Sequence, residues 1–177
     1  MSEINLYHAS VPVFIRYLNQ IELLLDKAKC FAISQSMEEA TLLVAGLADN
    51  MFPLGQQLST AIGFSLRACC PLARQDIKNY HPESVSYDNL HKQIRETRCY
   101  LEQLRPEQFE GAEGLSIATT AGFAELELAA GEYLQAYMLP NFFFHYSMCY
   151  AILRKMDCPL SKQDFDGFHQ YPMGFSF

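Results

Sequence analysis

His145 and Cys149 are the two residues of this sequence whose types and spacing best suit joint chemistry. Side chains four residues apart lie on one face of a helix, so this imidazole and this thiol could reach a common atom. Imidazole nitrogen and thiolate sulfur are good ligands for zinc or nickel. A nearby imidazolium also favours the thiolate form of a cysteine, which would make Cys149 a nucleophile. The pair thus predicts a divalent metal site or a reactive thiol.

The same pair has a simpler interpretation. Nearly every residue around it is apolar or aromatic, so a buried histidine would hydrogen-bond a backbone carbonyl or Gln57, beside a small apolar cysteine. A third hypothesis is a metal-free pocket in which His145 acts as a general base or contacts a ligand. We take four residues as candidate ligand-binding residues, and the first two of them as candidate metal ligands: His145, Cys149, Gln57 and Asn141. No residue is assigned a catalytic role.

Other histidines and acids of the chain are weaker candidates. A metal enzyme would need a third strong ligand, for which His8 and Asp49 are the candidates. His81 precedes a proline in a polar loop, and His91 lies off the apolar stripe of its helix. We predict that His81 is solvated and that His91 is a surface residue.

The elements that position these residues follow from the spacing of apolar side chains. Intervals of three and four predict amphipathic helices over residues 11–29, 53–72, 87–104 and 140–156. Ser36 and Glu39 predict a capping box before a short helix. Alternation over residues 116–120 and 123–128 predicts a β-hairpin. We therefore expect one all-α domain over residues 1–177, a four-helix bundle with a small β-hairpin before the last helix.

Composition excludes some classes of function. A formal net charge of −7, with basic residues scattered along the chain, argues against nucleic-acid binding. No run of about 18 apolar residues predicts a membrane span, and the first residues do not have the pattern of a signal peptide. We therefore predict a cytoplasmic protein without a membrane or nucleic-acid partner, whose six cysteines are reduced thiols.

The C-terminal residues 163–177 carry four Phe and one Tyr. Such a segment either packs back over the bundle or covers a partner copy, because exposed aromatic residues favour aggregation. A pair between Arg154 and Asp164 would fix it on the last helix. We expect a homodimer and allow for a small-molecule ligand.

Several sequence blocks together resemble a known group of proteins. They are Asn-Met-Phe-Pro-Leu at 50–54, Leu-Pro-Asn-Phe-Phe-Phe-His at 139–145, Tyr-Ala-Ile-Leu-Arg at 150–154, Pro-Leu-Ser-Lys at 159–162 and Asp-Phe-Asp-Gly at 164–167. This set is similar to a bacterial family of unknown function within the DinB/YfiT-like superfamily. The resemblance covers nearly the whole chain and implies a four-helix bundle, often dimeric.

The resemblance also implies a metal site, but this sequence differs from the family pattern at two of the three ligand positions. Superfamily relatives commonly hold a divalent metal with one histidine of the second helix and an H-x-x-x-H pair of the fourth. Here His145 matches the first histidine of the pair, Cys149 takes the second position, and Gln57 falls where the second-helix histidine is expected. Three hypotheses follow: a bundle with a small-molecule pocket, a divergent zinc or nickel hydrolase or thiol transferase, and a purely structural homodimer.

Overall fold

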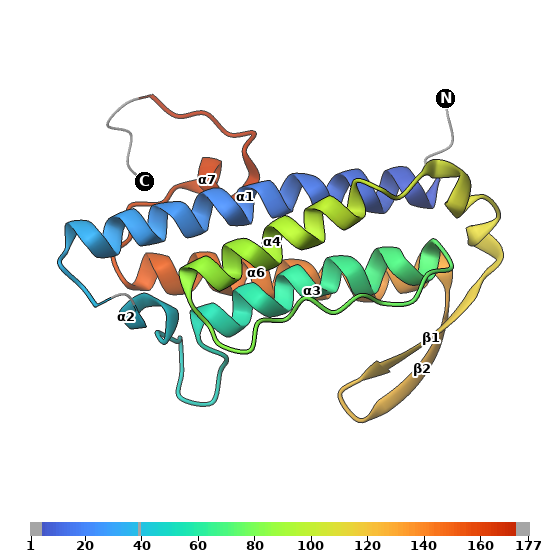
Figure 1. The fold of residues 1–177 in the computed structure, drawn as a ribbon, viewed down its shortest axis with the longest axis horizontal. Helices are drawn as coiled ribbons and strands as arrows, with labels where there is room; N and C mark the ends of the chain where they lie inside the picture. The colour runs from blue at the N-terminus through green and yellow to red at the C-terminus, as the bar shows by residue number, and fades with distance from the viewer. Residues whose placement is uncertain (1–4, 39, 173–177) are drawn as a thin grey trace.

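Four long helices form the bundle of this protein, whose computed structural model describes residues 5–38 and 40–172 (Figure 1). The long helices are α1 (Leu6–Ser34), α3 (Leu54–Leu72), α4 (Tyr87–Leu101) and α6 (Leu139–Lys155). The shorter elements are α2 (Ala40–Leu43), two 3₁₀ turns (Pro106–Phe109, Ala112–Gly114), β1 (Ser116–Ala121), β2 (Ala124–Ala129), α5 (Ala130–Glu132), a π-helical segment (Tyr133–Met138) and α7 (Lys162–Asp166). The expected all-α bundle with a β-hairpin before the last long helix is confirmed.

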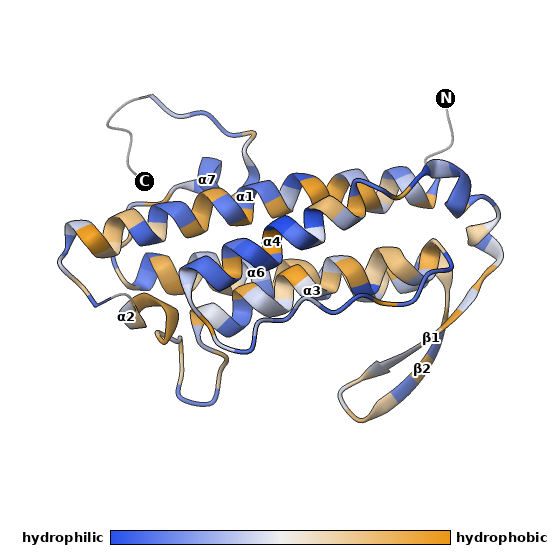
Figure 2. Cartoon of the chain, in the orientation of Figure 1, coloured by the Kyte–Doolittle hydropathy of each residue, from blue (hydrophilic) through white to orange (hydrophobic). Residues whose placement is uncertain are grey.

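The apolar stripes of the helices make one core. Figure 2 shows hydrophobic and hydrophilic residues interspersed along α1, and its predicted stripe is fully buried: Phe14, Leu18, Ile21, Leu25 and Ala28. The helix starts earlier than the predicted residue 11, because the side chain of Asn5 accepts a hydrogen bond from the amide of His8 and caps the first turn. None of the described helices is long and apolar enough to cross a membrane.

The end of α1 differs from the predicted capping box. Ser36 has a φ of 54° and lies in the left-handed region, whereas an N-cap residue is extended. The amide of Met37 donates to the carbonyl of Ala32 at 2.9 Å, which closes α1 in a Schellman motif with Ser36 at its left-handed position. The capping-box prediction is therefore wrong for Ser36, and its partner Glu39 lies outside the described residues.

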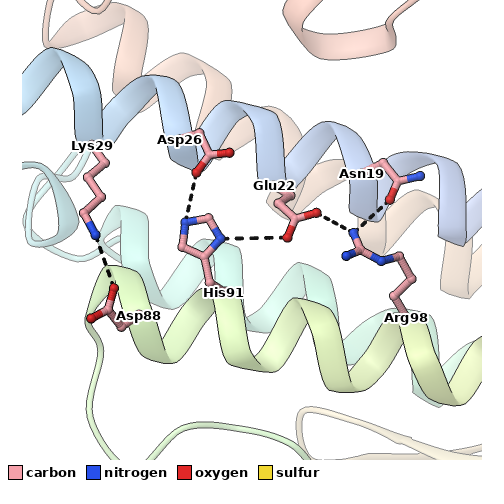
Figure 3. Close-up of polar contacts among 7 residues, drawn as sticks. All are labelled: Asn19, Glu22, Asp26, Lys29, Asp88, His91 and Arg98. Carbon is pink, nitrogen blue, oxygen red and sulfur yellow. Dashed lines mark hydrogen bonds and ion pairs between the residues drawn. The ribbon is translucent and has the colours of Figure 1, made fainter.

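Figure 3 shows a row of polar contacts along the seam between α1 and α4. Its residues are Asn19, Glu22, Asp26 and Lys29 on α1, and Asp88, His91 and Arg98 on α4. The ring of His91 lies between the carboxylates of Glu22 and Asp26, at 4.0 and 3.2 Å, and its side chain is only 21% exposed. His91, predicted to be a surface residue, is half-buried, because α4 packs this face against α1.

The start of α6 is built on an irregular turn. The π-helical segment runs directly into α6 at Leu139, and Pro140 occupies the first turn, where a proline costs no helical hydrogen bond. The side chain of Asn141 donates to the carbonyl of Tyr137 at 2.7 Å, which satisfies an acceptor of this turn.

The β-hairpin projects beyond the bundle before the π-helical segment (Figure 1), and Arg67 on α3 donates to Thr120 at its tip.

The described part of the C-terminal segment packs onto its own bundle. The ring of Phe165 stacks on Tyr146 of α6 at 4.4 Å, and the hydroxyl of Tyr146 donates to the Phe165 carbonyl. Asp164 pairs with Lys27 of α1. The expected pair between Arg154 and Asp164 was wrong, because the Arg154 guanidinium donates to the carbonyl of Leu160 instead.

Ser36→Gly should stabilise the protein. A non-glycine residue in the left-handed region is disfavoured by about 1 kcal/mol, and glycine removes that penalty, so we expect the free energy of unfolding to rise by up to this amount. Urea unfolding followed by circular dichroism measures it. The matched control Ser34→Gly, in the last turn of α1, should lower the free energy by about 0.5–1 kcal/mol. Equal destabilisation by both variants would contradict the assigned helix end.

Candidate functional site

A hydrogen bond between α3 and α6 joins two of the predicted site residues. His145 Nδ1 lies 2.7 Å from Gln57 Oε1, and the Gln57 amide nitrogen donates to the carbonyl of Phe52 at 3.3 Å. This second contact orients the amide, because its oxygen would face another oxygen if the group were reversed. The oxygen therefore accepts from His145, so the imidazole carries its proton on Nδ1. A neutral ring protonated there presents Nε2 as a hydrogen-bond acceptor.

Aromatic rings surround this imidazole. The ring of His145 stacks on Phe52 and Phe64, with centroid distances of 6.2 and 5.5 Å, and Phe144 meets it edge-on. Phe64 is buried, whereas Phe52 and Phe144 are 43% and 52% exposed. Desolvation by burial lowers the pKa of His145 below its usual value, which favours the neutral form. The site is thus a neutral acceptor nitrogen with two exposed aromatic rings beside it.

Cys149 belongs to the core and takes no part in this arrangement. Its side chain is fully buried, and its sulfur donates to the carbonyl of His145, one turn earlier on α6. Burial raises the pKa of the thiol well above its usual value. A protonated thiol directed at its own helix is a poor nucleophile and a poor metal ligand, since both roles need the thiolate.

The donor set does not fit the metal that the resemblance implies. Gln57, in place of a histidine, uses its oxygen for His145 and its nitrogen for Phe52. Asn141 is held by its own turn. In residues 5–38 and 40–172, no group of three or more His, Cys, Asp and Glu side chains is arranged to hold a metal ion. The metal-ligand assignment of His145 and Cys149 therefore stays a prediction without geometric support.

The candidates for a third ligand have other contacts or positions. His8 Nδ1 lies 2.8 Å from Asn5 Oδ1 at the exposed start of α1. Asp49 lines a cavity of about 280 Å³ between the loop after α2 and Lys155 at the end of α6. In neither case do the described contacts link the side chain to His145.

His81 makes a contact that its sequence position did not indicate. Its Nδ1 lies 2.8 Å from the hydroxyl of Ser59 on α3, and its ring covers Gly63 one turn further along that helix. A Cβ at Gly63 would approach the ring to 2.8 Å. His81 is exposed, as predicted, and one side of its ring packs against α3. In the sequence, the sign of this contact was that Ser59 and Gly63, two small residues four apart on one helix face, leave room for a ring.

Comparisons with known proteins agree with the fold. The model of a family described as a domain of unknown function (DUF1993) matches residues 6–166. The crystal structure of a DinB family member protein from Shewanella denitrificans superimposes with a TM-score of 0.85 at 25% sequence identity, covering 94% of each chain. No curated protein matches the chain. These likenesses support the DinB-like fold, and the printed descriptions give no reaction or ligand.

We predict that Cys149 is unreactive in the folded protein. Cys30 and Cys99 are exposed, whereas Cys149 is buried and its thiol pKa is raised, so two fast-reacting thiols are expected with Ellman's reagent. Cys149→Ser should leave that count unchanged, and denaturant should release all six thiols of the wild-type protein and five of the variant. Loss of a fast-reacting thiol in Cys149→Ser would revive the nucleophile hypothesis.

His145→Ala should destabilise the protein by about 1–3 kcal/mol at neutral pH, because it leaves Gln57 Oε1 without its donor. The effect should shrink in acid. The folded-state pKa of His145 is lowered, so below about pH 6.5 the unfolded chain takes up the proton first and wild-type stability falls.

Urea unfolding of both proteins at neutral pH and at about pH 5.5 measures this difference. His81 also has a pKa lowered by burial, but it is present in both proteins, so its contribution cancels in the comparison. Equal stability of the two proteins at neutral pH would contradict the buried hydrogen bond.

Proposed function

We propose that this chain, which belongs to the DUF1993 family and has a DinB-like fold, binds a small molecule at His145 without a metal ion. The ligand we propose carries a planar apolar ring and one O–H or N–H donor. His145 Nε2 would accept that hydrogen bond, while Phe52 and Phe144 would cover the ring. The single observation that carries the proposal is the orientation of the imidazole by Gln57.

Pre-organisation supports this role. Gln57 is 2% exposed and is held by the Phe52 carbonyl, so the imidazole does not have to find its tautomer or its orientation when a ligand arrives. The stacked rings of Phe52 and Phe64 limit rotation of the imidazole in the same way. A neutral acceptor fixed beside exposed aromatic carbon suits recognition of an aromatic alcohol or amine better than that of an anion.

The geometry does not favour the hypothesis of a zinc or nickel hydrolase or thiol transferase. Activation of a water or thiol by a metal needs strong ligands around one ion, and Gln57, Asn141 and Cys149 are each bonded to other protein groups. The homodimer stays a prediction. Phe165 of the aromatic segment stacks on α6 of its own chain.

Phenol and anisole test the proposal as a matched ligand pair. Both present an aromatic ring, but only phenol has a donor for His145 Nε2. We expect phenol to bind about tenfold more tightly, because one hydrogen bond is worth about 1.4 kcal/mol in a favourable case. Binding is followed by NMR shifts of residues 52, 64, 144 and 145.

His145→Phe keeps a ring in place and removes the acceptor, so the preference for phenol should disappear. Phe123→Ala, at the fully exposed hairpin tip, is the control and should leave it unchanged. Equal binding of phenol and anisole to the wild-type protein, or shifts that cluster elsewhere, would overturn the proposal.

A further inference from the structure

A polar cavity lies between α4 and the loop that precedes it. It has a volume of about 390 Å³, is open to solvent on one side and is bordered by the loop 79–84 and by α4, with side chains that include His81, Glu83, Lys92, Gln93 and Glu96. This volume is within the range of small-molecule sites. Its lining is mostly polar, in contrast to the aromatic surroundings of His145.

The loop wall of this cavity is fixed by several hydrogen bonds. The amide of His81 donates to Asn79 Oδ1 at 3.0 Å, and the ring of His81 is tied to Ser59 on α3. The side chain of Asn89 on α4 donates to both the carbonyl and the hydroxyl of Ser84, at 3.0 and 3.1 Å. Both ends of the loop segment are therefore anchored to helices, so the cavity exists before any ligand binds.

Gln93, one of the lining residues, carries a buried acceptor. Its side chain is 2% exposed, and its amide nitrogen donates to the carbonyl of Ser59 at 3.1 Å. That contact orients the amide, since a reversed group would place oxygen against oxygen. The Oε1 atom is buried and has no hydrogen-bond partner among the described residues. Buried carbonyl oxygens are nearly always paired in folded proteins, so this atom indicates a donor that the described residues do not provide.

The charged side chains around the cavity indicate which class of hydrogen-bond donor it would bind. Lys92 and Glu96 lie 3.9 Å apart one turn along α4, so each offsets the charge of the other. Glu83 adds a carboxylate from the loop. His81 is held in its neutral form, because desolvation by burial lowers its pKa. The cavity therefore carries a net negative charge together with an unpaired acceptor.

We propose that this cavity binds a small organic cation with N–H donors, of the alkylguanidinium or alkylammonium class. One N–H group donates to Gln93 Oε1, and Glu83 balances the positive charge. The competing occupant is a water shared with Thr97, whose buried hydroxyl one turn along α4 also has no partner among the described residues.

Propylguanidinium and propylurea are the probes, because they have similar shape and N–H donors but differ in charge. We expect propylguanidinium to shift the NMR signals of residues 79–84 and 89–96, and propylurea to bind about fivefold more weakly. Gln93→Leu should weaken binding of the cation about tenfold by removing the acceptor.

Exposed variants keep the test independent of folding. Glu83→Gln should weaken binding of propylguanidinium about fivefold, and Lys92→Gln should tighten it, since it removes a like charge. Glu113→Gln, an exposed change in the 3₁₀ turn before the hairpin, is the control and should have no effect. Two results would overturn the proposal. The first is the absence of localised shifts with either probe, which would mean that Gln93 and Thr97 bind a shared water. The second is cation binding that neither Gln93→Leu nor Glu83→Gln weakens.

Discussion

The hydrogen bond from His145 to Gln57 is the constraint on which this account of the molecule depends. It links α3 to α6 at the place where superfamily resemblance implies a metal. The Phe52 carbonyl fixes the Gln57 amide, and the amide in turn fixes the protonated nitrogen of the imidazole. Because this contact occupies both Gln57 and the Nδ1 atom of the imidazole, it leaves Nε2 as the remaining acceptor, on which the proposed ligand site depends.

Much of the fold could be predicted because the core depends on spacing. The stripe from Phe14 to Ala28 identified α1, and the alternation around Gly122 identified the hairpin. The ends of elements were less accessible. Asn5 starts α1 before the predicted residue. Ser36 ends α1 in the left-handed conformation, although from the sequence alone a serine at this position is equally consistent with an N-cap of the next helix. Local hydrogen bonds, rather than apolar periodicity, decide these positions.

The candidate site was predictable in part for a related reason. Gln57 and His145 were expected to meet, and they do, because each lies on the inner side of a long helix. Cys149 shares that helix face, yet its thiol bonds to its own backbone, an outcome that residue type and spacing alone do not distinguish from a ligand. His81 could not be placed from sequence, since its contact with Ser59 depends on how the loop before α4 folds back over α3.

Long-range ¹H–¹⁵N NMR of the wild-type protein labelled with ¹⁵N-histidine tests the central claim most directly. At neutral pH we expect a neutral His145 with its proton on Nδ1 and an unprotonated Nε2. In Gln57→Leu we expect the ring to be free to adopt the tautomer with its proton on Nε2. A wild-type His145 protonated on Nε2, or on both nitrogens, would contradict the assigned hydrogen bond, and with it the acceptor that the proposed ligand requires.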